Sequence, residues 1–421
     1  MDFKTIIKEQ IEDIKNIEKT ENIIKREAIN KAESFLRYPN ALAVTGVRRC
    51  GKSIFSYLIA KNKNFGYINF DDERLLGMKA DSLNKILQSF YELYGDIEYV
   101  ILDEVQNIVG WELFVNRLRR TKKVIITGSN SKLLAGELST HLTGRHIDII
   151  LFPFSFSEFL TINQFRQQDT YTTREKAQIL NLLEKYLRTG GFPEANKFGR
   201  TILARIYNDI LTKDILLRYK IKKITNIKEL SKYIISNFCR EISYSGLAKL
   251  LNVKRISTIS NWLSYLEDSF LTFKLERFSF KMKQQIIAPK KIYCIDNGIV
   301  NAVAFKFSED MGYFMENAVA VELQMRKILS SLLEIYYWKN HQQYEVDFLI
   351  KYGNKVKELI QVTYAFDEND IKERETTSLL KASAELKCSN LKIITWDYEA
   401  EKRYHSKMVK FIPLWKWFLK K

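Results

Sequence analysis

The segment GVRRCGKS at 46–53 has the residue types and the spacing of a phosphate-binding loop, or P-loop. It follows an apolar β-branched run and precedes a helix-compatible segment, so backbone N–H groups and a helix N-terminus are expected to point at phosphate oxygens. Gly46 and Gly51 allow the backbone to curl closely around the phosphates. Lys52 is expected to bridge the β- and γ-phosphates, and the Ser53 hydroxyl is expected to bind Mg²⁺. We therefore predict a site for ATP and Mg²⁺ formed by Gly46, Val47, Arg48, Arg49, Cys50, Gly51, Lys52, Ser53 and Ile54.

Two acids end the apolar run YVILDE at 99–104. Asp103 is expected to hold Mg²⁺ through a water molecule, so that Ser53 and Asp103 are the predicted metal residues. Glu104 is placed to polarise the attacking water, the step that separates hydrolysis of ATP from its binding. A buried strand with an exposed acidic end is the structural alternative, but it leaves the neighbouring P-loop unexplained.

Two further residues are predicted to act at the nucleotide. Asn130 follows the run KVIITG and is the preferred contact to the γ-phosphate or the water, with Ser129 second; a turn with a helix N-cap explains both equally well. Arg145, just before the run HIDIIL, is predicted to sense the γ-phosphate or to reach a neighbouring subunit, with a plain surface arginine as the alternative. The predicted catalytic residues are Lys52, Glu104, Asn130 and Arg145.

A second cluster of chemistry-bearing residues lies near the C-terminus. Metal-dependent nucleases of the PD-(D/E)xK type need a helix glutamate, a strand aspartate, and an acid-x-lysine pair on the next strand. Glu316 in MENAVAVEL, Asp347 in YEVDFLI, and the pair Gln361 and Thr363 in ELIQVTY follow this order. Because Gln361 and Thr363 stand where acid and lysine belong, a degenerate, non-cutting site is predicted over an active nuclease.

Two further acids near this cluster are predicted to lie on different faces of their strands. Glu358 has the opposite parity to Gln361 and should face away, whereas Glu345 shares a face with Asp347 and partly compensates. Ordinary helix-surface and strand-end polarity is the structural alternative for Glu316 and Asp347.

A helix–turn–helix pattern occupies the middle of the chain. ISYSGLAKLLNV predicts a short helix and a turn, and KRISTISNWLSYLEDSF predicts a second helix with Ile256, Ile259, Leu263 and Leu266 on one face. The following FLTFKLERFSF alternates like a hairpin, which completes a winged-helix pattern. Nucleic-acid contacts are predicted at the exposed start of the second helix, and a purely structural packing module is the equal alternative. These residues are Lys254, Arg255, Ser257, Thr258, Ser260 and Asn261.

The elements that must position these residues indicate an α/β protein. Apolar runs at 41–46, 66–70, 99–104, 123–128 and 146–151, separated by helical patterns, predict a parallel sheet and hence a P-loop nucleoside-triphosphatase core. Beyond it we predict a helical and winged-helix region and an α/β nuclease-like C-terminal domain. The predicted boundaries are 1–39 for an N-terminal helical segment, 40–160 for the core, 161–225 for a helical region, 226–285 for the winged helix, and 286–421 for the last domain.

The composition of the chain limits the classes of protein to which it can belong. The chain has 421 residues, 46% of them hydrophobic, and a formal net charge of +17, which favours a polyanionic partner unless it reflects only solvated surface lysines. The four cysteines lack metal or redox spacing and the charged N-terminus is not a secretory leader, which favours reduced thiols and a cytoplasmic location. No run approaches the ~18 apolar residues of a membrane span.

These motifs together resemble a family of prokaryotic AAA+-superfamily ATPases. The resemblance rests on TGVRRCGKS, INFDDERL, YVILDEVQNIVGWELFVNRL, IITGSNSKLL, HLTGRHIDIILFPFSFSEFL and TGGFPE in this order. It is specific over the first 195 residues and covers nearly the whole chain. It implies an ATPase core, a winged helix, a C-terminal domain of unknown function with a restriction-endonuclease-like core, and homo-oligomers with shared sites.

Three hypotheses about function remain open at this point. The preferred one is an ATPase that uses ATP and Mg²⁺ to remodel or regulate bound DNA, RNA or protein. The alternatives are an ATP-gated metal-dependent nuclease, and a slow nucleotide-dependent switch or scaffold with a protein partner.

Overall fold

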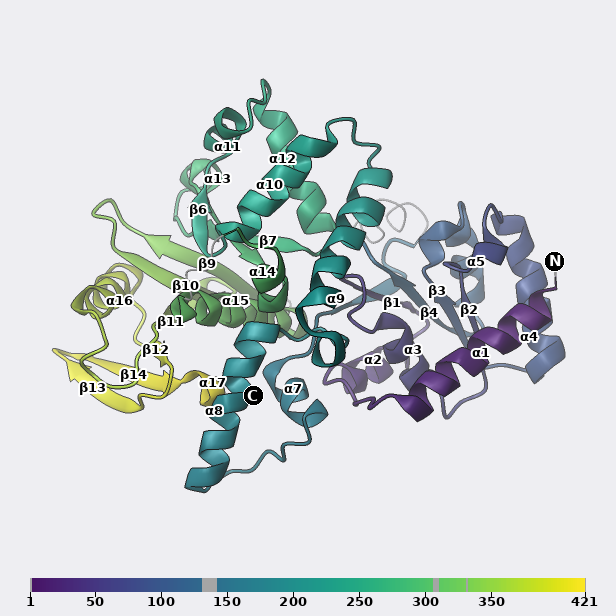
Figure 1. Cartoon of the computed structure of the whole chain (residues 1–421), viewed down its shortest axis with the longest axis horizontal. Helices are drawn as coiled ribbons and strands as arrows, with labels where there is room; N and C mark the ends of the chain where they lie inside the picture. The colour runs from purple at the N-terminus through teal and green to yellow at the C-terminus, as the bar shows by residue number, and fades with distance from the viewer. Residues whose placement is uncertain (1, 131–141, 306–309, 331, 421) are drawn as a thin grey trace. The chain divides into compact units, whose positions relative to one another are not determined.

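The predicted apolar runs form the strands of one parallel sheet (Figure 1). The computed structural model describes residues 2–130, 142–305, 310–330 and 332–420. Within these residues the first sheet has the strand order β2-β3-β4-β1-β5, and all of its pairs are parallel. The strands are β1 (Ala41–Gly46), β2 (Phe65–Asn69), β3 (Tyr99–Asp103), β4 (Lys123–Gly128) and β5 (His146–Leu151). The α/β class predicted from the sequence is confirmed.

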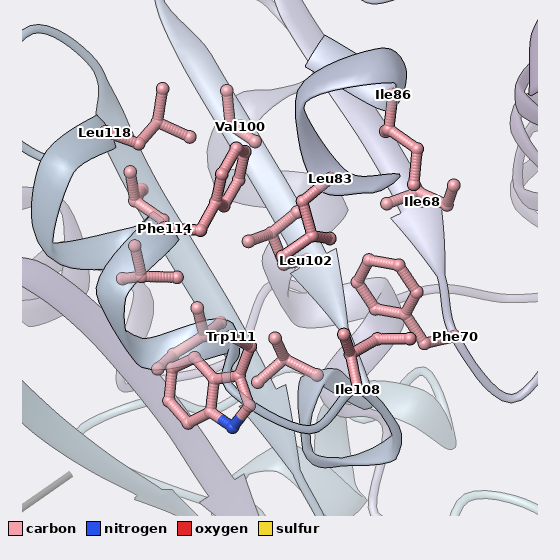
Figure 2. Packing of buried hydrophobic residues seen from close by; sticks show 14 of the residues in the cluster. Ile68, Phe70, Leu83, Ile86, Val100, Leu102, Ile108, Trp111, Phe114 and Leu118 are labelled. Carbon is pink, nitrogen blue, oxygen red and sulfur yellow. The ribbon is translucent and has the colours of Figure 1, made fainter. Parts of the chain in front are cut away.

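This sheet belongs to the first of two compact units. The unit comprises Met1–Pro153 with the short segments Thr161–Gln164 and Asp268–Phe270. Its helices are α1 (Phe3–Thr20), α2 (Ile29–Phe35), α3 (Lys52–Ala60), α4 (Leu83–Tyr94) and α5 (Trp111–Leu118). Figure 2 shows strand residues such as Val100 and Leu102 packed against Leu83 of α4 and Phe114 of α5. Because this apolar core holds β2, β3 and β4 together, the polar ends of those strands are held in fixed positions.

The second unit contains the helical region, the middle of the chain and the C-terminal part. It comprises Phe154–Leu160, Phe165–Glu267 and Leu271–Lys421. Its first helices are α7 (Phe156–Ile162, which extends into the first unit), α8 (Thr173–Thr189) and α9 (Ala195–Asp209), followed by the π-helix η5 (Ile210–Leu217). As far as the chain is described, one nine-stranded sheet runs through this unit in the order β13-β14-β12-β11-β10-β9-β7-β8-β6.

The predicted helix–turn–helix is present, but the predicted hairpin after it is wrong. The elements are α10 (Ile224–Ser236), β6 (Arg240–Ile242), α11 (Tyr244–Leu250), α12 (Ile256–Asp268), β7 (Thr272–Arg277), α13 (Met282–Ile287) and β8 (Lys290–Cys294). The antiparallel partner of β7 is β8, which follows α13, and not the segment 278–280. Ile256 also departs from the predicted buried face: it is the first residue of α12 and is 51% exposed, whereas Ile259, Leu263 and Leu266 are buried.

The C-terminal elements continue the same sheet. They are α14 (Asn297–Val303), α15 (Met311–Leu329), β9 (Leu333–Lys339), β10 (Glu345–Tyr352), β11 (Lys355–Val362), α16 (Glu373–Leu386), β12 (Leu391–Thr395), β13 (Ala400–Tyr404), β14 (Lys407–Pro413) and α17 (Leu414–Leu419). Strands β9, β10 and β11 are antiparallel neighbours, and α16 connects β11 to the parallel strand β12. Since β8 pairs with both β6 and β7, the sheet crosses the predicted boundary at 285/286. The domain boundaries themselves stay predictions.

The TGGFPE segment forms a close approach of backbone inside the second unit. Gly190 has φ 74°, and a Cβ there would lie 1.9 Å from Oδ1 of Asp296. The buried Asp296 carboxylate accepts hydrogen bonds from the backbone N–H of Gly191 at 2.7 Å and of Gly298 at 2.8 Å. Only glycine satisfies both the backbone conformation and the lack of space at position 190.

We predict that Gly190→Ala destabilises the protein more than Gly199→Ala does. Both glycines have positive φ, 74° and 58°, so alanine at either one carries about 1–3 kcal/mol of backbone strain. At Gly199 nothing lies within 4 Å of the new Cβ, whereas at Gly190 the methyl group meets Asp296 and adds roughly 1–3 kcal/mol of overpacking. Urea unfolding measures the difference, and equal losses for the two variants would contradict the close approach.

Candidate functional site

The P-loop turns directly from β1 into α3, as the sequence predicts. Gly46 has φ 147°, and a Cβ there would lie 2.1 Å from the carbonyl oxygen of Leu151 on β5. Gly51 has φ 96° immediately before α3, and Arg49 within the turn has φ 64°. A side chain at position 46 would therefore push β1 away from β5, which accounts for glycine at this end of the loop.

Arg26 braces the P-loop from the N-terminal segment. Its side chain is 7% exposed, and its guanidinium donates to the carbonyl oxygens of Cys50 at 3.0 Å and Phe152 at 2.7 Å. A longer contact reaches Pro153 at 3.4 Å. The planar fork of arginine suits several acceptors at once, so this one side chain ties the loop to the end of β5. Cys50 itself is buried, and burial raises the pKa of its thiol.

Asp103 lies at the carboxyl end of β3 and is completely buried. Its Oδ2 accepts a hydrogen bond from the Tyr67 hydroxyl at 2.7 Å, and its Oδ1 accepts one from Thr127. The Ser53 hydroxyl is also hydrogen-bonded to this carboxyl group. Burial, together with the adjacent Glu104, raises the pKa of Asp103 above its ordinary value, and these hydrogen bonds oppose the rise. The two predicted metal residues, Ser53 and Asp103, are thus in direct contact.

Glu104 has a left-handed backbone conformation with φ 50° and ψ 44°. Its N–H donates to the Thr127 hydroxyl at 2.9 Å, and Gln106 donates to its Oε2. A non-glycine residue in this conformation costs about 1–3 kcal/mol and persists where the surroundings enforce it, often at functional sites. Thr127 binds both the backbone of Glu104 and the side chain of Asp103, so it sets the direction in which each acid points.

Lys52 connects the loop and the acids. Its side chain is 5% exposed, and its ammonium donates to the carbonyl oxygens of Gly46 at 3.2 Å and Val47 at 3.3 Å. It also lies 3.8 Å from Oε1 of Glu104. The structure therefore brings together Lys52, Ser53, Asp103 and Glu104. Three features fit a magnesium–nucleoside triphosphate: the lack of room for a side chain at Gly46, the buried carboxylate of Asp103, and the long contacts of the Lys52 ammonium.

The other two predicted catalytic residues lie at opposite edges of the sheet. Ser129 and Asn130 follow β4 and are each 1% exposed, at the edge where β1 and β3 also end. Arg145 is exposed and precedes β5, and its backbone carbonyl accepts from Ala41 at the start of β1. Its guanidinium contacts Asn116 at 3.3 Å. Arg145 therefore lies at the end of β1 opposite the P-loop. Its two predicted roles, as a γ-phosphate sensor or as a contact to a neighbouring subunit, stay predictions.

The predicted nuclease-like residues meet in the second unit. Gln361 on β11 donates through Nε2 to Oδ2 of Asp347 on β10 at 2.7 Å. Asp347 Oδ1 and Glu316 Oε1 from α15 both bind the ammonium of Lys291 on β8, at 3.1 and 2.9 Å. Glu345 binds the same ammonium at 2.6 Å, in agreement with its predicted shared face with Asp347. Glu358 instead pairs with Lys392, and the Thr363 hydroxyl is hydrogen-bonded to Glu375.

Four of these contact residues were missed by sequence reasoning. Arg26, Tyr67, Thr127 and Lys291 belong to no motif, and their partners are 23–126 residues away along the chain. The available sequence signal is weak. Lys291 is a lysine in the apolar run KKIYCI, and Thr127 is a hydroxyl residue in the apolar run KVIITG.

The predicted nucleic-acid contacts are accessible. Lys254, Arg255, Ser257 and Asn261 are exposed at the turn before α12 and on its first turns, whereas Thr258 and Ser260 are half-buried. Their accessibility permits a nucleic-acid contact without identifying a ligand. Over the ranges that the structure covers, no helix is long and apolar enough to cross a membrane, and no group of three or more His, Cys, Asp or Glu side chains is disposed to hold a metal ion.

Comparisons with known proteins agree with the core. Residues 38–160 match the model of an AAA domain, and residues 180–310 and 311–417 match two domains of unknown function (DUF8612 and DUF4143). The uncharacterized protein MJ1544 of Methanocaldococcus jannaschii is 36% identical over all of this chain and 96% of its own length. An uncharacterized protein of Haemophilus influenzae is 28% identical over 80% of this chain and 85% of its own length.

Among solved structures, the chain is similar to the Walker-type ATPase PABY2304 of Pyrococcus abyssi. The identity is 16%, the match covers 68% of this chain and 97% of that one, and the TM-score is 0.46.

We predict that Arg26→Met weakens nucleotide binding roughly tenfold, the equivalent of ~1.4 kcal/mol. Removing the guanidinium leaves the carbonyls of Cys50 and Phe152 without their donor, so the loop must be ordered by the ligand. Titration with a fluorescent ATP analogue measures the affinity. Lys25→Met is the matched control, because Lys25 is the exposed neighbour of Arg26. Equal affinities for the two variants would show that Arg26 does not organise the loop.

Proposed function

The chain belongs to the same family as the Methanocaldococcus jannaschii relative, within the AAA+ P-loop ATPases, and we propose that it hydrolyses ATP with Mg²⁺. We further propose that hydrolysis remodels or regulates a bound nucleic acid or protein. The contact between Ser53 and Asp103, with Glu104 and Lys52 beside it, carries the proposal for hydrolysis. This arrangement places the P-loop next to Asp103, the proposed metal ligand, and next to a second acid, Glu104, at the end of one sheet.

ATP supplies the phosphoanhydride bond, and Mg²⁺ neutralises the charge of its phosphates. In this chain, Ser53 and Asp103 would hold the metal ion, and hydrogen bonds from Thr127 and Tyr67 keep the carboxyl group of Asp103 in place. Lys52 would exchange the carbonyls of the loop for phosphate oxygens, since its contacts of 3.2 and 3.3 Å to these neutral carbonyls are weaker than contacts to a charged phosphate.

Glu104 is the proposed general base or water-orienting group. Its left-handed backbone and the hydrogen bond from its N–H to Thr127 fix the direction of its Cα–Cβ bond. Its carboxylate faces the ammonium of Lys52 at 3.8 Å. If Lys52 bound a phosphate instead, the carboxylate of Glu104 would lose this ion pair and would be available to orient a water molecule.

We predict that Lys52→Ala and Glu104→Gln separate binding from hydrolysis. Lys52→Ala removes the phosphate-binding ammonium, so both ATP affinity and turnover should fall by at least tenfold. Glu104→Gln retains the shape of the side chain but not its basicity, so binding should persist while turnover falls by about a hundredfold or more. Phosphate release and analogue titration are the two measurements.

Lys63→Ala is the matched control for these variants, because Lys63 is an exposed lysine just beyond α3. Unchanged turnover in Lys52→Ala would refute the assignment of the site. Normal binding by the wild type with no measurable turnover would favour a nucleotide-dependent switch over an ATPase.

The formal charge of +17 and the exposed Lys254 and Arg255 favour a nucleic acid as the regulated partner. We predict that DNA or RNA stimulates ATP hydrolysis and that the stimulation fades as salt is raised. The double variant Lys254→Ala/Arg255→Ala should lower the slope of binding against the logarithm of salt concentration by about two. The exposed pair Lys355→Ala/Lys357→Ala on β11 is the charge-matched control. If neither DNA nor RNA has any effect, the partner is a protein.

A further inference from the structure

The ammonium of Lys291 lies at the centre of the C-terminal cluster of acids. It contacts Glu316 at 2.9 Å, Glu345 at 2.6 Å and Asp347 at 3.1 Å. The Lys291 side chain is 4% exposed. Its burial by itself lowers the pKa of the ammonium, but the surrounding carboxylates, Glu316 first, raise this pKa well above its ordinary value. An ammonium has three N–H donors, and here each has a carboxylate acceptor.

The elements that supply these groups are distant in sequence. Lys291 comes from β8, Glu316 from α15, and Glu345 and Asp347 from β10. A second layer of contacts fixes the carboxylates. The Tyr293 hydroxyl donates to Glu316 at 2.8 Å, and the backbone N–H of Val362 donates to Asp347 at 3.0 Å. The carboxylate oxygens are therefore held in place around one point, the position of the Lys291 ammonium.

A divalent metal would require the same oxygens. Oxygen ligands stand about 2.1 Å from Mg²⁺ and about 2.3–2.6 Å from Ca²⁺, and in this site the three carboxylate oxygens stand 2.6–3.1 Å from a nitrogen. The ammonium and a metal ion cannot occupy this centre together. Movement of Lys291 out of it would break three ion pairs in the protein interior.

We propose that Lys291 is the permanent cation of this site, placed where a metal-dependent nuclease holds its divalent ion, and that the C-terminal domain therefore does not cleave nucleic acid. The residues on and just after the neighbouring strand β11 also differ from those of a nuclease. Gln361 takes the position of the second acid and donates to Asp347, and Thr363 takes the position of the lysine.

A second lysine shares one carboxylate of this cluster. Glu345, which binds Lys291 at 2.6 Å, also lies 3.1 Å from the ammonium of Lys339, and Lys339 in turn pairs with Glu241 at 2.7 Å.

The proposal predicts that removing Lys291 converts the cluster into a metal site. In the full-length chain without nucleotide, Lys291→Ala should have a lower melting temperature than the wild type. Mn²⁺ or Ca²⁺, but not K⁺, should restore it. Electron paramagnetic resonance of Mn²⁺ should show one more bound equivalent per chain than in the wild type, and this equivalent should disappear in Lys291→Ala/Asp347→Ala.

The matched control is Lys339→Ala, which removes a partly buried lysine that also pairs with Glu345 but does not contact Glu316 or Asp347. It should gain no Mn²⁺ and no stabilisation by metal. If Lys291→Ala folds but neither binds Mn²⁺ nor regains stability, the site is not a replaced metal centre and the proposal is wrong.

The wild type provides a test that does not depend on folding of the variant. An Mn²⁺ bound by the wild type and lost in Asp347→Ala, or cleavage of DNA or RNA with the same dependence, would overturn the proposal. The absence of both supports it. ATP hydrolysis plays no part in these measurements, so their outcome is independent of the proposed ATPase activity.

Discussion

The nucleotide site depends on one constraint, the alignment of strand ends in a parallel sheet. Because β1, β3 and β4 run in the same direction, the loop after Gly46, the acids at 103 and 104, and the polar residues at 129 and 130 lie at one edge. Close packing of β1 against β5 is needed to hold that edge, and it leaves no room for a side chain at Gly46. Arg26 secures the same junction from outside the sheet through the carbonyls of Cys50 and Phe152.

Both Glu104 and Arg49 at this edge have a left-handed backbone. The backbone of Glu104 is held by the hydrogen bond from its N–H to Thr127, and Thr127 also binds Asp103. The Thr127 hydroxyl therefore couples the positions of Asp103, the proposed metal ligand, and Glu104, the proposed base. Asp103 and Glu104 are neighbours in sequence but have different surroundings. Asp103 is completely buried and contacts Ser53, whereas Glu104 faces Lys52.

Two buried lysines show how the surroundings decide the role of the same side chain. Lys52 is 5% exposed and holds two neutral carbonyls at 3.2–3.3 Å and one carboxylate at 3.8 Å, so a phosphate can replace these partners. The side chain of Lys291 is 4% exposed and contacts three carboxylates within 3.1 Å. Removing one partner of a buried ion pair typically costs about 3–5 kcal/mol, so we expect Lys291 to stay in place as a structural cation, whereas Lys52 can exchange its partners.

The sequence by itself determined the parts that are local. Apolar runs predicted all five parallel strands to within a residue or two, and the spacing of Gly46, Gly51, Lys52 and Ser53 predicted the loop, because a strand–turn–helix is encoded by consecutive residues. Strand parity also placed Glu345 with Asp347 and turned Glu358 away. The hairpin over 270–280 failed because alternation marks a strand but not its partner, which here lies beyond α13.

Only the tertiary structure decided which distant side chains share a site. It showed Arg145 at the amino edge of the sheet, Arg26 under the P-loop, and Lys291 among acids that are 25 to 56 residues away in sequence. The physical reason is that a buried ion pair depends on which elements pack together. That packing follows from the whole apolar core and leaves no periodic signal at the charged residues themselves.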